Sequence, residues 1–107
     1  MSQHCFPTTC HGEPVFILMG WDRPLQGYFL VIKCEHRDAL LYSNLEDHEL
    51  RQCMGMPRSL DHFLKRLSEF GVQVPSRMLN EIKADAKANV GNRYVVYDAA
   101  GHMTTEC

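Results

Sequence analysis

Apolar residues gather in two runs in the first third of the chain, and these runs predict two β-strands. Residues 15–19 and 28–34 are rich in Val, Ile, Leu and Phe, which favour strands. The segment 23–27 between them contains a proline and a glycine, which favour a turn. We therefore expect an antiparallel hairpin with a wide loop, followed by a third short strand over residues 39–42.

The second half of the chain predicts two amphipathic helices. Between residues 60 and 70, leucine and phenylalanine recur every three or four positions, with Ser59 placed to cap the start and Gly71 to end the helix. A second helix is expected from Ser76 to about Asn89. Its inward side would carry Met78, Leu79, Ile82 and Ala86. Its outward side would carry mainly Arg77, Glu81, Lys83 and Asp85.

These elements define the expected fold class. Residues 93–97 return to strand-forming side chains, and a turn over 98–101 that ends in glycine predicts a short return strand. The order β-β-β-α-α-β-β predicts an α+β fold, a mostly antiparallel sheet with both helices packed on one face. Residues 1–12 lack clear periodicity and are expected to form a loosely ordered N-terminal arm, while 13–107 form a single domain. A length of 107 residues with 45% hydrophobic content agrees with one such domain.

The net charge and the length of the apolar runs limit the kinds of partner that the chain could bind. The net charge is −2 and the basic residues are scattered, so we expect no binding to nucleic acid. The longest apolar run is far shorter than the ~20 residues of a membrane-spanning helix, so no membrane is expected as a partner either. In the absence of a secretory signal we expect a cytoplasmic protein whose five cysteines stay reduced. The chain also lacks a nucleophile elbow, a phosphate-binding loop and a dinucleotide fingerprint.

The first two strands are apolar on both faces, although two helices can cover only one face of a sheet. The second face would carry Phe16, Leu18, Phe29 and Val31. Either the chain covers this face itself, with the arm or the C-terminal hairpin, or another chain covers it. In the second case these residues form an interface with a protein partner or with a second copy in a homodimer, because large exposed apolar patches are uncommon in monomers.

A second candidate surface lies at one end of the predicted sheet, where the loops after the first and third strands meet. These loops bring together Trp21, Asp22, Arg23, Asn44 and His48. An aromatic side chain, an arginine and several hydrogen-bond acceptors on neighbouring loops are typical of a recognition surface. The alternative is local packing of these side chains, with the adjacent acids Glu46 and Asp47 forming a solvated helix start.

The cysteines and histidines provide the main candidate for chemistry. Cys5, Cys10, Cys34 and His36 offer four ligands of the type that binds zinc tetrahedrally. The alternative is a flexible arm that binds no metal, because Cys-x₄-Cys lacks the short loop of most structural zinc sites. The sequence indicates no other cofactor.

Two stretches, residues 19–24 and 91–93, resemble small proteins of bacterial genomes and mobile elements, a resemblance that implies no particular activity. The sequence as a whole predicts a small bacterial protein of the accessory or inhibitor type, without enzymatic activity. It would bind another protein through the apolar sheet face or through the loop end with Trp21, Arg23 and His48. The alternative is a small zinc-binding or thiol-dependent enzyme domain that uses the cysteines and histidines.

Overall fold

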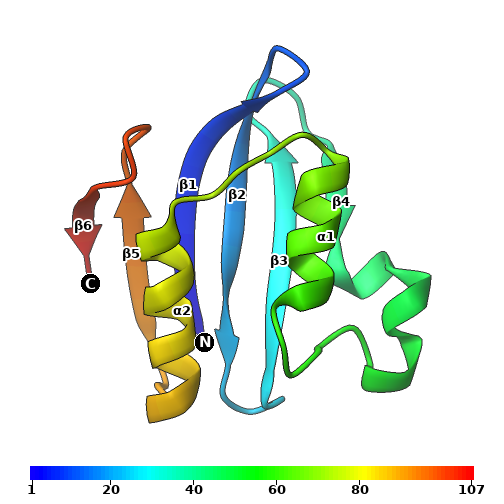
Figure 1. Cartoon of the computed structure of the whole chain (residues 1–107), viewed down its shortest axis with the longest axis vertical. Helices are drawn as coiled ribbons and strands as arrows, with labels where there is room; N and C mark the ends of the chain where they lie inside the picture. Colours follow the sequence, from blue (N-terminus) through cyan, green and yellow to red (C-terminus); the bar gives the residue numbers. More distant parts are fainter.

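The computed structural model describes all 107 residues and shows one six-stranded sheet with two helices on one face (Figure 1). The strands are β1 (Ser2–Cys10), β2 (Glu13–Asp22), β3 (Gly27–Cys34), β4 (Leu40–Ser43), β5 (Arg93–Tyr97) and β6 (Met103–Glu106). The helices are α1 (Asp61–Glu69) and α2 (Ser76–Ala88), preceded by the short 3₁₀ helices η1 (Asn44–Glu46) and η2 (His48–Cys53). The predicted α+β class is confirmed.

The strands follow the order β4-β3-β2-β1-β5-β6 across the sheet. All neighbouring pairs are antiparallel except β1 and β5, which are parallel. The predicted hairpin and third strand are β2, β3 and β4, and the predicted C-terminal hairpin is β5 and β6. Gly101 has a φ of 87° in the turn between β5 and β6, as a glycine at that position permits.

The expectation of a loosely ordered arm over residues 1–12 is wrong. Ser2–Cys10 form β1, which lies in the interior of the sheet between β2 and β5. Sequence reasoning missed this strand because two of its inward positions carry polar side chains, Ser2 and His4, both fully buried. Pro7 also argues against a central strand. It lies beyond Cys5, the last residue of β1 that pairs with β5, so its missing N–H removes no bond to that neighbour.

The start of β1 lies against β2 at a glycine. A Cβ atom at Gly20 would lie 1.9 Å from the backbone oxygen of Ser2, so no larger residue fits there. The Ser2 hydroxyl accepts a hydrogen bond from the backbone N–H of Trp21 at 3.0 Å. The close approach of these two strands therefore depends on Gly20 and Ser2.

The core lies between the sheet and the two helices. Five side chains from β2 and β3 are fully buried on this face: Val15, Ile17, Met19, Leu30 and Ile32. They pack in one cluster with four buried side chains from the helices: Phe63, Leu67, Met78 and Ile82. Neither helix has the length and apolar character that crossing a membrane requires.

The predicted end of α1 is confirmed, because Gly71 has a φ of 70° just past the helix. The predicted cap at its start is not: the N-cap is Leu60, which has no side-chain cap, and the Ser59 hydroxyl accepts from the N–H of Asp61 at 3.1 Å just before the helix. One outward position on α2 is wrong, because Asp85 is only 2% exposed.

Candidate functional site

Neither helix covers the second face of the sheet (Figure 1). Phe16, Leu18 and Val31 project from this face and are partly exposed, whereas their inward-facing neighbours along the same strands are fully buried. Leu18 pairs with Val31, and Phe29 pairs with Gly20, where it approaches the glycine closely. The four residues predicted for an interface therefore lie together on one face.

The apolar surface extends onto the neighbouring strands. Cys5 pairs with Leu18 on one side and with Val96 on the other, and Pro7 pairs with Phe16. We call this surface the open face and define it by seven residues: Cys5, Pro7, Phe16, Leu18, Phe29, Val31 and Val96. None of them is charged, and Lys33, which pairs with Phe16, is a charged residue at the border.

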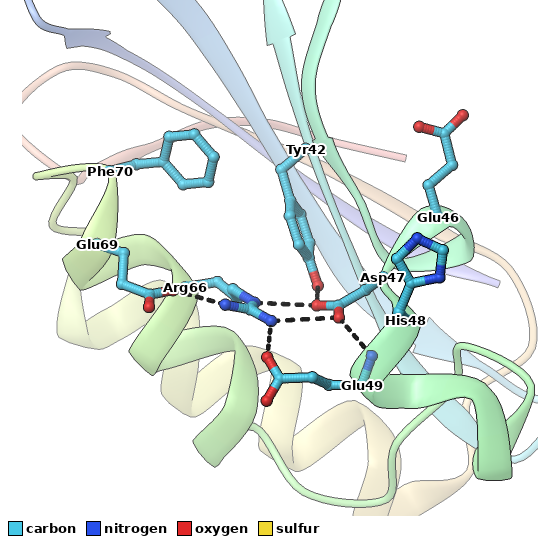
Figure 2. Close-up of a pocket in the computed structure, with 8 residues that line it drawn as sticks. All are labelled: Tyr42, Glu46, Asp47, His48, Glu49, Arg66, Glu69 and Phe70. Atoms are coloured by element: carbon cyan, nitrogen blue, oxygen red, sulfur yellow. Dashed lines mark hydrogen bonds and ion pairs between the residues drawn. The ribbon is translucent and has the colours of Figure 1, made fainter.

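A polar pocket of about 500 Å³ lies between the 3₁₀ segment and α1 (Figure 2). The Asp47 carboxylate lies at its base, with its side chain only 3% exposed. One carboxylate oxygen accepts hydrogen bonds from the Tyr42 hydroxyl at 2.6 Å, from Arg66 Nε at 3.0 Å and from His62 Nε2 at 2.9 Å. The other oxygen accepts from the backbone N–H of Glu49 at 3.0 Å. These contacts join β4, η2 and α1.

The charged side chains in this pocket form ion pairs and hydrogen bonds with one another. Burial alone would raise the pKa of Asp47, but hydrogen bonds from Arg66, Tyr42 and His62 hold it well below its usual 3.8. Arg66 also pairs with Glu49 and, at 2.8 Å, with Glu69. Burial and the hydrogen bond to Asp47 raise the pKa of Tyr42, which therefore keeps its proton at neutral pH.

The same pocket contains a group of potential metal ligands, Asp47, Glu49 and His62, whose ligand atoms lie within 4.8 Å of one another. The Arg66 guanidinium already pairs with both carboxylates. The His62 Nε2 atom donates a hydrogen bond to Asp47, because a carboxylate only accepts, so this nitrogen has no lone pair free for a metal. In this arrangement these residues do not fit a metal ion. Their hydrogen bonds and ion pairs instead connect the 3₁₀ segment to α1.

A second polar network is buried between β1, β5 and α2. His4 is fully buried, and its Nε2 atom donates to Asp85 at 2.6 Å while its Nδ1 atom accepts from the Tyr97 hydroxyl at 2.8 Å. Arg93 donates to the second oxygen of Asp85 at 2.7 Å. Two further carboxylates, Glu81 and Glu106, complete the pairing of Arg93.

Sequence reasoning missed this network, although a signal is present. Asp85 lies seven residues after Met78 and three after Ile82, so it falls on the buried stripe of α2. A charged residue on such a stripe requires a buried partner. The partner His4 could not be identified, because it lies in the segment predicted to be an arm.

Burial favours the neutral form of His4. Burial lowers the pKa of His4 below its usual 6.5, and Arg93 acts in the same direction, while Asp85 opposes both. Burial raises the pKa of Tyr97 to about 12, so its hydroxyl keeps the proton that it donates to His4. Each nitrogen of the imidazole then has a partner, Asp85 at Nε2 and Tyr97 at Nδ1.

We expect acid to destabilise the fold through His4. The unfolded chain takes up a proton at this residue below about pH 6.5, whereas the folded chain, with its lowered pKa, resists it. The contribution of His4 to stability is therefore fully present above about pH 6.5 and is lost as the pH falls below this value. Urea unfolding of the wild type and of His4→Gln checks this. The variant should lose stability less steeply, and equal slopes would contradict the assignment to His4.

Most of the residues predicted for the loop end serve local structure instead. Trp21 is buried against Tyr28 and donates to Asn89 at 3.1 Å. Asp22 accepts from the N–H of Leu25 in the hairpin turn at 3.1 Å.

Of the other residues predicted for this surface, one is buried and two are exposed to solvent. Asn44 is buried and bonds to Gly55 at 2.8 Å. Only Arg23 and His48 are exposed, and His48 contacts Arg51 at 3.0 Å. The five residues therefore do not form one exposed recognition surface.

The predicted zinc ligands do not converge. Cys5 lies on the open face, whereas Cys10 and Cys34 are buried on the helix-covered face, and His36 lies in an exposed loop. The prediction is wrong because Cys5 and Cys10 are five residues apart on one strand, which puts them on opposite faces. All five thiols are free.

None of the protein families, curated proteins or solved structures with which we compared the chain matches it.

Proposed function

We propose that this chain is a non-enzymatic domain that binds a protein through the open face. The observation that supports this proposal is the contrast between the two faces of the sheet. Both helices lie over one face, while the other carries uncharged side chains with no helix over it; most of these are partly exposed, and Phe29 is 6% exposed. Four strands ~4.8 Å apart, with about five residues of each at ~3.4 Å per residue, make a patch of roughly 300 Å². Patches of this size on monomers often mark interaction sites.

The polar clusters support a binding role over catalysis. Both clusters consist of side chains that already satisfy one another, and His4 and Asp85 have no access to solvent. A catalytic base or nucleophile needs a side that faces its substrate. We include a cytoplasmic location and a bacterial origin in the proposal, with an accessory or inhibitor-type role. Free thiols agree with a reducing compartment.

The test compares capture of a protein from a native lysate by the wild type and by Leu18→Glu, a change at the open face. Leu64→Glu is the matched control, since Leu64 is an exposed leucine on α1, away from this face. We expect a stoichiometric complex, with another protein or with a second copy of the chain, for the wild type and the control and none for Leu18→Glu. Capture that is unaffected by Leu18→Glu, or a wild type that binds nothing and stays monomeric, would remove the proposal.

A further inference from the structure

We infer that the occupant of the open face is a second copy of this chain, packed sheet on sheet about a twofold axis. This inference rests on the proposed function and names the partner. The two open faces would form the middle of a four-layer particle, with the helices of each copy on the outside.

The size of the face fits such a dimer. The whole face is six strands wide, and its central strands have eight to ten residues. The three outer strands have only four or five residues, so with each strand at its own length, ~4.8 Å between strands and ~3.4 Å per residue, the face measures roughly 650 Å². A stable interface buries about 800 Å² on each partner. One further copy of the same face is therefore enough to cover it.

The chemistry of the face also favours a copy of itself. The seven residues of the open face carry no charge, so they offer nothing to select a partner of opposite charge. An apolar surface is complementary to an identical apolar surface, as an interface between two identical subunits requires. Two sheets with the same twist pack with their strands about 30° apart, so the fold already supplies the matching shape.

Leu18 lies near the middle of the patch, between Cys5 and Val31. In a twofold dimer, a residue near the centre lies close to the symmetry axis and faces the same region of the other copy. Leu18→Glu would therefore bring two unpaired carboxylates together at the most buried point of the interface. We expect the dissociation constant to rise at least about a hundredfold.

The experiment measures the mass of the purified protein by light scattering over a concentration series. We expect twice the chain mass of 12.3 kDa for the wild type and for Leu64→Glu, and the single mass for Leu18→Glu. Circular dichroism checks that the variants are folded.

A second measurement needs no variant. Cys5 lies on the open face, whereas Cys53 is an exposed thiol outside it and serves as the internal standard. Dimerisation should slow alkylation of Cys5 by about tenfold or more between dilute and concentrated solution and leave Cys53 unchanged.

The outcomes separate this inference from the proposed function. If the protein is monomeric at every concentration and Cys5 is alkylated at a constant rate, the inferred dimer is contradicted. A dimer that persists in Leu18→Glu overturns it as well, because the contact then lies elsewhere. If the wild type is monomeric but its capture of another protein depends on Leu18, the inferred dimer is wrong and the proposed function stands. If that capture is also absent, the proposed function fails too.

Discussion

Asp85→Ala is expected to lower the free energy of unfolding by about 3–5 kcal/mol, the cost of removing one partner from a buried ion pair. The Asp85 side chain is only 3% exposed and accepts from both His4 and Arg93. Its truncation leaves a buried imidazole N–H without an acceptor and weakens the pairing of the guanidinium. These groups come from β1, β5 and α2, so the substitution acts on the parallel strand pair and on the helix above it.

The matched control is Glu81→Ala, which removes a different carboxylate from the same Arg93. Glu81 pairs at 2.7 Å, but its side chain is 33% exposed, so we expect a loss below about 1 kcal/mol. Urea unfolding of both variants measures the difference. Asp85→Asn keeps the shape of the side chain and an acceptor for His4, so its loss of stability should lie between those of Asp85→Ala and Glu81→Ala. This variant replaces Asp85→Ala in the comparison if Asp85→Ala does not fold. Equal losses for Asp85→Ala and Glu81→Ala would mean that burial does not determine the strength of this network.

The elements predicted correctly from the sequence are those with a local signal. The stripe of leucines and phenylalanines identified α1, and Gly71 marked its end. The two apolar runs identified β2 and β3, and their apolar character on both sides predicted a face that the helices leave open. Each of these signals lies within a few residues of the element that it describes.

The elements that were missed depend on partners far away in the sequence. β1 could not be recognised from its own residues, because His4 is buried only through Asp85 and Tyr97, 81 and 93 positions away. Without those partners, a buried histidine and a solvated histidine look the same in the sequence.

The predicted loop end failed for a different reason. Asp22 and Asn44 are residue types that serve both recognition and turn formation, and in this fold their side chains bond to nearby backbone. The sequence places them at the correct end of the sheet but does not show where their hydrogen bonds go.

The acidic pair of Glu46 and Asp47 shows the same ambiguity within two adjacent residues. Both were predicted to be solvated, yet only Glu46 is exposed. The Asp47 side chain turns inward to partners from β4 and α1, Tyr42 and Arg66 among them (Figure 2). This difference between neighbours makes them a natural pair of variants.

Asp47→Ala is therefore expected to cost about 2–4 kcal/mol of unfolding free energy, because it leaves partly buried donors on Tyr42, His62 and Arg66 without their acceptor. Glu46→Ala, one residue away, should change the stability little. Urea unfolding measures both. A second readout is the ultraviolet titration of Tyr42, whose raised pKa comes from burial and from Asp47. In Asp47→Ala this phenol should ionise at lower pH than in the wild type. If both variants lose the same unfolding free energy and the Tyr42 titration does not change, Asp47 is solvated, as the sequence predicted.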